Sequence, residues 1–169
     1  EGIATHRDGE RLRFEDPEGL GLELMVVDTD DAPLAARQPD TDRIVTWEVA
    51  GAAHADASLL EYGRIANPDV EFDLGEFIPT MNRGPQRGVL RAAFIALHDW
   101  VVSGTRPPPG DPIETVDGHL RRDADGNAIG GIRTPAVDAP VAAHSGESDR
   151  DEIIFQLFGS TIPFTPGHL

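Results

Sequence analysis

The stretch 43–56 (RIVTWEVAGAAHAD) limits the possible folds of this chain more than any other segment. It begins with β-branched and aromatic residues over 44–49, a composition that is typical of a buried strand. The small residues 50–53 then end the strand, and His54 follows at once. Open α/β sheets keep their reactive groups beyond the carboxyl ends of their strands. The stretch therefore predicts a sheet that carries an imidazole at one edge.

A second strand-like run lies upstream at 22–27 (LELMVV) and is nearly continuously apolar, as a strand buried on both faces should be. It ends in an acidic cluster that contains Asp28, Asp30 and Asp31. A carboxylate after one strand and a histidine after the next follow the chain order of a triad whose nucleophile comes first. We predict that Asp30 is the acid partner of His54. Asp28 and Asp31 remain alternatives, because one sequence does not fix the register at a strand end.

The two residue types suit a defined chemistry. An imidazole can take a proton from a nucleophile and return it to a leaving group, while a carboxylate on the other ring nitrogen fixes the tautomer. Simpler interpretations stay open beside this one. His54 could only hydrogen-bond its own loop, and the acidic cluster could be a solvated turn.

No nucleophile is recognisable in the chain. There is no cysteine, which excludes a thiolate nucleophile, a disulfide framework and a cysteine-ligated zinc. The absence of cysteine does not indicate whether the protein works in an oxidising or a reducing compartment. None of the serines stands in a Gly-x-Ser-x-Gly pattern or follows a buried strand as a nucleophile elbow must. The serines are Ser58, Ser103, Ser145, Ser148 and Ser160. Because the nucleophile should precede the acid, we expect it upstream of Glu1.

Two patterns resemble metal sites without completing one. His54 and Asp56 have a His-x-Asp spacing, but no second histidine is near in the sequence. The turn 123–127 (DADGN) is similar to the start of a calcium loop, but the later acidic ligand is replaced by 132–134 (IRT). We interpret it as a hairpin turn and predict no metal and no cofactor.

The charge of the chain excludes one class of partner. The formal net charge is −16, and all 14 basic residues are arginine. Such a field repels phosphate backbones, so no nucleic-acid partner is expected, and the acidity favours solubility. No apolar run approaches the length of a membrane span. The sequence opens at Glu1 without a methionine or a signal pattern, so we expect it to be a fragment of a longer protein.

The strongest helix signal covers 85–103. Pro85 suits a first helical turn, and the prolines at 107–109 forbid continuation. Apolar residues recur with the helical period and predict one buried face. These residues are Leu90, Ala93, Phe94, Leu97 and Val101. We interpret the segment as a core helix that packs on the sheet and carries no chemistry.

The other segments are expected to be shorter elements. The sequence predicts a loop or short helix over 1–21, a helix over 57–62, a hairpin that pairs 113–121 with 128–132, an extended segment over 134–142, and apolar covers over 153–158 and 162–164. We expect one partial domain, with the sheet and helix in 1–104 and an extended, hairpin-rich region in 105–169.

Several strings carry a resemblance to a known family. They are ARQPDTDRIVTWEVAGAAHAD, NRGPQRGVLRAAFIALHDWVVSGTRPP, DADGNAIGGIRTPAVDAPVA and LFGSTIPF. Over about 22–164 the chain resembles the C-terminal half of a large bacterial group of α/β-hydrolase domain proteins. The resemblance implies an α/β-hydrolase fold, a serine nucleophile on a preceding segment, and His54 as the triad histidine. Family members commonly carry Glu-Thr-Asp after the acid-bearing strand, where this chain has 28–30 (DTD). The match at Asp30 supports it as the acid, and the departure at Asp28 leaves the choice open.

We therefore expect the C-terminal part of an α/β-hydrolase fold, with the last parallel strands, the last helix and a β-rich, loop-rich C-terminal extension. The expected function is hydrolysis of a small carboxylic ester through a serine triad. This chain is expected to supply the acid and the histidine of the triad and to be inactive alone. One alternative is a non-catalytic α/β-hydrolase scaffold that serves binding. Another is a free-standing binding module, which would have to cover two buried strands with one good helix.

Overall fold

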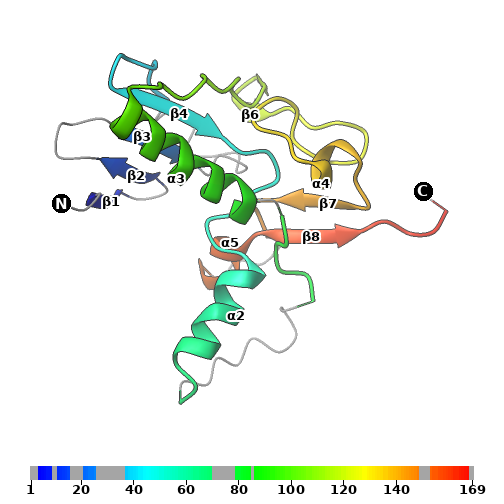
Figure 1. Cartoon of the computed structure of the whole chain (residues 1–169). Helices are drawn as coiled ribbons and strands as arrows, with labels where there is room; N and C mark the ends of the chain where they lie inside the picture. The colour runs from blue at the N-terminus through cyan, green and yellow to red at the C-terminus, as the bar shows by residue number, and fades with distance from the viewer. Residues whose placement is uncertain are drawn as a thin grey trace.

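The structure is a computed structural model, and it describes residues 4–8, 11–15, 21–25, 37–69, 79–84, 86–148 and 153–167. Its largest sheet has the strand order β1-β2-β3-β4 (Figure 1). The strands are β1 (Ala4–Asp8), β2 (Arg11–Glu15), β3 (Gly21–Met25) and β4 (Ile44–Glu48). The strands predicted over 22–27 and 44–49 correspond to β3 and β4, and residues 26 and 27 lie outside the described part of the chain.

The direction of the strands decides where the chain leaves the sheet. β3 and β4 run parallel, with Gly21 opposite Ile44 and Met25 opposite Glu48. The other pairs, β1 with β2 and β2 with β3, are antiparallel. Because parallel strands end at the same edge of a sheet, Met25 and Glu48 lie together at one edge.

The prediction of a loop or short helix over residues 1–21 was wrong, because that segment contains β1 and β2. His6 lies opposite Arg13 in their antiparallel ladder. The sequence of β2, RLRFE, alternates polar and apolar residues with the period of a strand. The turn signals on both sides of this short alternation favoured a loop in the sequence analysis. The pairing that stabilises the two strands is also not a local property of the sequence.

Helix α3 (Gln86–Ser103) covers the sheet and confirms the predicted helix, but its buried face differs from the predicted one. Phe94 and Val101 were expected inside, and they are 40% and 39% exposed. The buried stripe shares Ala93 and Leu97 with the predicted face, and its centre is rotated from that face by about 60° around the helix axis. It consists of Val89, Ala93, Leu97 and Trp100. Trp100 supplies the largest apolar surface, and the small Ala93 allows close approach of the helix to the sheet.

The C-terminal region consists of short elements. They are β5 (Thr115–Val116), β6 (His119–Leu120), α4 (Pro135–Asp138), β7 (Ala142–Ser145), α5 (Ile153–Phe158) and β8 (Ser160–Pro163). The predicted return of 128–132 against 113–121 is confirmed in part, by an antiparallel bridge from Ile113 to Gly130. The segment 113–121 is not one strand, because it turns at Asp117 and Gly118 so that β5 pairs with β6. The extended segment predicted over 134–142 was wrong at its start, because Pro135 opens α4 with a φ already suited to a helix.

Helix α2 (Ala57–Ala66) begins where the sequence predicted a helix and extends beyond the predicted end at residue 62. It buries none of its residues and projects away from the sheet (Figure 1). None of the described helices is long and apolar enough to cross a membrane.

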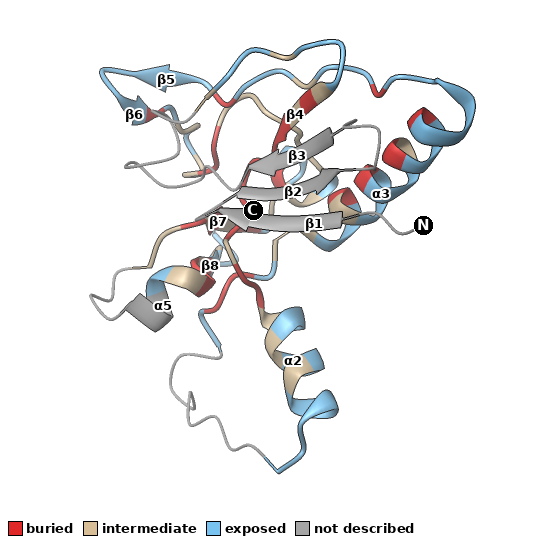
Figure 2. Ribbon diagram, turned by 90° about the vertical axis from the view of Figure 1, so that its left-hand side faces the viewer, coloured by how far each residue is buried: buried red, intermediate tan, exposed pale blue. Residues whose placement is uncertain are grey.

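Three apolar clusters meet at the segment 49–55, directly after β4. One cluster joins β4 to α3 and includes Val49 and Ala52. A second contains Ala50 with residues of the C-terminal hairpins, and a third joins Ala55 to Met81 and Phe158. Figure 2 shows buried residues along β4 and exposed residues along the outer side of α3. The small side chains after β4 therefore form the junction of the core.

Candidate active site

His54 lies on the short connection between β4 and α2, residues 49–56, which we call the His54 connection. The chain turns at Gly51, whose φ is +74°, a value that favours glycine. His54 itself is half-buried, between the buried residues Ala53 and Ala55. Asp56 then caps α2, because its Oδ1 accepts the Leu59 N–H at 2.8 Å. The imidazole is thus the polar, partly accessible group of a segment whose other side chains fill the core.

Main-chain bonds to separate segments hold this connection on both sides of His54. The Ala50 N–H donates to the Ile132 carbonyl at 3.1 Å, and the Ala55 N–H donates to the Leu157 carbonyl at 2.8 Å. Each anchor uses backbone atoms, so it fixes the path of the chain on either side of His54. Preorganisation of this kind suits a group that must receive a proton at a defined position.

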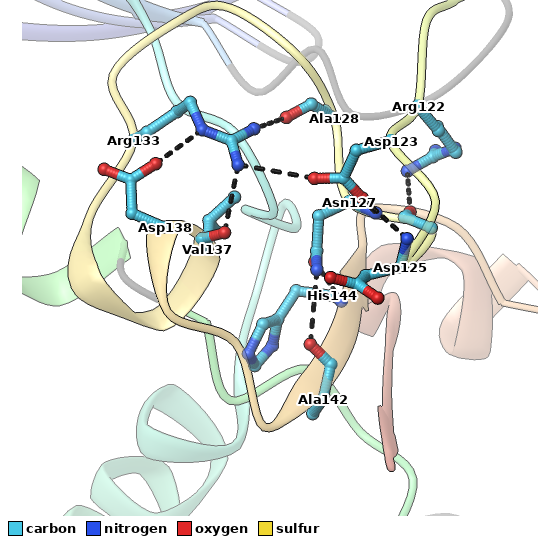
Figure 3. Close-up of polar contacts among 11 residues, drawn as sticks. Arg122, Asp123, Asp125, Asn127, Ala128, Arg133, Val137, Asp138, Ala142 and His144 are labelled. Carbon is cyan, nitrogen blue, oxygen red and sulfur yellow. Dashed lines mark hydrogen bonds and ion pairs between the residues drawn. The ribbon is translucent and has the colours of Figure 1, made fainter. Parts of the chain in front are cut away.

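A second histidine, His144 of β7, packs against the same connection from behind. A β-carbon on Gly51 would lie 2.9 Å from the His144 β-carbon and 3.1 Å from Val137, so only glycine fits at this position. The His144 N–H donates to Asn127 Oδ1 at 2.8 Å, which ties β7 to the turn 123–127. Figure 3 shows His144 beside Asn127, with Ala142 of the same strand below them.

The ring of His144 is set up to be neutral. Its Nδ1 lies 3.1 Å from Thr161 Oγ1, and that oxygen accepts the Arg83 N–H at 2.9 Å. The Thr161 hydroxyl can therefore give its own hydrogen to an unprotonated Nδ1. Burial lowers the pKa of His144, because a charged imidazole would lose its hydration. His144 is a scaffold residue behind the His54 connection.

The three acid candidates, Asp28, Asp30 and Asp31, lie outside the described residues. The chain is described again from residue 37, and there it is anchored to the end of β4. Arg37 donates from Nε and from Nη2 to the two carboxylate oxygens of Glu48, each at 2.7 Å. Arg37, a few residues beyond the acidic cluster in the sequence, is therefore bound to the strand that precedes His54.

Glu48 is almost fully buried, and its carboxylate has a second hydrogen-bond donor besides Arg37. Its Oε2 accepts the Ile113 N–H at 2.7 Å, while Arg37 also donates to the Ile113 carbonyl at 2.6 Å. A buried carboxylate that is paired and hydrogen-bonded avoids the penalty of an isolated charge. These three residues join the end of β4 to the chain at residue 37 and to the C-terminal hairpins.

Arg133 organises the turn and α4 beside β7 (Figure 3). Its guanidinium binds Asp138 Oδ1 at 2.7 Å, the Val137 carbonyl at 3.0 Å and Asp123 Oδ2 at 3.4 Å, and it also donates to the Ala128 carbonyl. The hydrogen bond to Asp138 raises the pKa of Arg133. The predicted turn is confirmed, since the Gly126 N–H donates to the Asp123 carbonyl at 3.1 Å.

Several residues of this region were not identified from the sequence. Glu48 had a signal, because a carboxylate interrupts the apolar run of β4. His144 had none, because its neighbours in space come from distant parts of the chain. Of the predicted site residues, the structure places His54, and it does not describe the aspartates with which it was paired.

In this structure a parallel strand pair continues, at its carboxyl end, into a loop that contains a histidine. Open α/β sheets place their ligand-binding groups beyond the carboxyl ends of the strands in the same way. Comparison with protein families agrees with this class. A family model described as an alpha/beta hydrolase domain matches residues 12–169, and the chain belongs to that family. Membership confirms the resemblance to α/β-hydrolase domain proteins and indicates hydrolysis as the class of reaction. Searches among curated proteins and among solved structures found no match.

Proposed function

We propose that this chain supplies the histidine and the carboxylate of a serine triad that hydrolyses carboxylic esters. The observation that carries the proposal is the parallel pairing of β3 and β4. It brings the carboxyl ends of both strands to one edge, and His54 follows one of them. The acid candidates Asp28, Asp30 and Asp31 follow the other within a few residues.

In this proposal His54 acts first as a base and then as an acid. It takes the proton of a serine hydroxyl as the oxygen attacks the ester carbonyl, and it gives that proton to the departing alcohol. It then takes a proton from water, which attacks the acyl-enzyme, and returns it to the serine oxygen. Asp30 is the proposed partner of the other ring nitrogen, where it holds the tautomer and stabilises the imidazolium.

The serine is proposed to come from a part of the protein that precedes Glu1. The family's chain order places the nucleophile before the acid. Two serines of the present chain are engaged locally: Ser103 Oγ donates to the Asp99 carbonyl at 2.6 Å, and Ser145 Oγ accepts the Glu147 N–H at 3.1 Å. Neither stands on a strand-to-helix elbow.

A fluorophosphonate probe tests the reaction class in the intact protein. Such a probe labels a serine only where a base activates it. We expect one labelled serine outside residues 1–169, with labelling greatly slowed in His54→Ala and unchanged in His98→Ala, which removes an exposed imidazole from α3. A folded protein that neither reacts with the probe nor hydrolyses activated esters would instead favour the non-catalytic binding protein. Labelling of one of the five serines present here would refute the upstream position of the nucleophile.

A further inference from the structure

Asn82 lies in the segment between α2 and α3, and its side chain is completely buried. Its Nδ2 donates to the carbonyl oxygens of Ser145 at 2.8 Å, Gly51 at 3.0 Å and Ser160 at 3.3 Å. Its Oδ1 accepts the Gly84 N–H at 2.7 Å. One amide thus joins the His54 connection to β7 and to β8.

The bonding pattern requires an amide in one orientation. The Gly84 N–H must face an acceptor, so the opposite side of the group must be the donor that faces the carbonyls. An aspartate of the same shape would set a second oxygen against the carbonyls of Gly51, Ser145 and Ser160. An alanine would leave these buried acceptors with fewer donors, which destabilises the fold.

Asn82 holds the His54 connection at both flanks. Before His54 it binds the carbonyl of Gly51 through its side chain, and after His54 its own carbonyl accepts the Ala57 N–H at 2.9 Å. The main-chain N–H of Asn82 donates to the Phe158 carbonyl at 3.1 Å, so Asn82 is itself fixed to the C-terminal region. Gly84 completes this arrangement, because a β-carbon there would collide with the Gly51 carbonyl oxygen.

We propose that Asn82 is a positioning residue for the reaction of His54. Its side chain hydrogen-bonds backbone atoms, and it acts by fixing the backbone from which the imidazole projects. This inference rests on the proposed function, because it assigns Asn82 to the same site. A displaced imidazole slows proton transfer and leaves ester binding intact, so kcat should fall while KM stays constant.

Asn127 offers a matched control for Asn82. It is also completely buried, its Nδ2 donates to the Ala142 carbonyl at 3.4 Å, and its Oδ1 accepts the His144 N–H. These bonds tie the turn 123–127 to β7 and are not made to the segment 51–57. Asn82→Ala and Asn127→Ala therefore each remove a buried side-chain amide. Only Asn82→Ala removes the hydrogen bond to the carbonyl of Gly51 in the His54 connection.

The experiment compares both variants in the intact protein by Tm, by kcat and KM for an activated ester, and by the NMR signal of the His54 ring, identified by its absence in His54→Gln. Both variants should lower Tm. Only Asn82→Ala should lower kcat, by about 100-fold with KM unchanged, and shift the His54 signal. Equal kcat in the two variants together with an unmoved His54 signal in Asn82→Ala would overturn the proposal.

Two further outcomes are also decisive. If the wild-type protein shows no hydrolysis that depends on His54, the proposed function fails, and the His54 signal still tests Asn82 as the residue that places the ring. If Asn82→Ala does not fold, Gly84→Ala takes its place, because it keeps Asn82 in the chain while its β-carbon collides with the Gly51 carbonyl oxygen and with Asn82 Oδ1 and so disturbs the contact between them. A Gly84→Ala protein with wild-type kcat and an unmoved His54 signal would overturn the proposal in the same way.

Discussion

At the residue scale, the roles of the two histidines described near β4 and β7 differ because their surroundings differ. His54 is half-buried on a connection whose backbone is anchored on both sides. His144 is 6% exposed and has a hydroxyl partner that suits its neutral form. A group that exchanges protons with a substrate needs access to it, so the accessible histidine is the one that suits catalysis.

The acid partner of His54 can be identified by single amide substitutions. Asp30→Asn should lower kcat by about 10⁴-fold, since an amide no longer holds the correct tautomer of the imidazole. Asp28→Asn and Asp31→Asn are the matched controls from the same acidic cluster, and each should retain most of the activity. Ester hydrolysis at saturating substrate is the measurement. A larger loss in either control than in Asp30→Asn would transfer the role to that residue.

His144 should make the stability of the protein depend on pH. Its pKa is lowered in the folded state, so the unfolded chain binds more protons as the pH falls below the ordinary histidine pKa of about 6.5. Its contribution is fully present above that pH and is lost progressively below it. Urea unfolding at pH 7.5 and pH 5 should show a smaller loss for His144→Asn than for the wild type.

The control for this pH effect is His119→Asn, which removes an exposed histidine from β6. If His144→Asn lost as much of the free energy of unfolding between the two pH values as the wild type, the burial of His144 would not account for the acid sensitivity.

At the element scale, the sequence identified the elements whose pattern is local. The strand 44–48 and the helix 86–103 carry long apolar runs or periods, and the turn 123–127 has its glycine at φ +83°. The hairpin β1–β2 and the helix α4 escaped prediction, because pairing and the contacts of Arg133 stabilise them. The same division holds in the site, where His54 followed from a strand end and Asn82 depends on segments far apart in the chain.

Arg133 should be the residue on which α4 and the turn 123–127 depend most. Arg133→Lys keeps the charge but removes the fork that reaches two carboxylates and two carbonyls, so it should destabilise the fold by about 1–3 kcal/mol. Arg121→Lys is the control, since its pair with Glu114 is exposed and should contribute less than about 1 kcal/mol. Urea unfolding measures both, and equal effects would show that the Arg133 network is not the support of these elements.

At the scale of the whole molecule, apolar side chains remain on the outer faces of two helices. Leu59, Tyr62 and Ile65 share one side of α2, with exposures of 56%, 68% and 74%. On α3, Ile95 and Val102 are 57% and 70% exposed. Patches of this kind favour association when no partner covers them, and the net charge of −16 opposes it.

Residues 1–169 expressed alone should therefore associate and should not hydrolyse esters. Salt should promote association, because it screens the repulsion between like charges. Light scattering at low and high salt, together with the hydrolysis of a short-chain activated ester, measures both properties. A monomer that unfolds cooperatively would show that these apolar faces need no cover, and serine-dependent turnover by that monomer would place the nucleophile within the chain.

The most direct test of the central claim is the turnover of His54→Ala in the intact protein. We predict that kcat for ester hydrolysis falls by about 10³–10⁶-fold, the range for loss of a triad member, while the unfolding transition stays close to that of the wild type. His98→Ala should retain full activity. A folded His54→Ala protein with near-wild-type turnover would contradict the assignment of His54 as the base of the reaction.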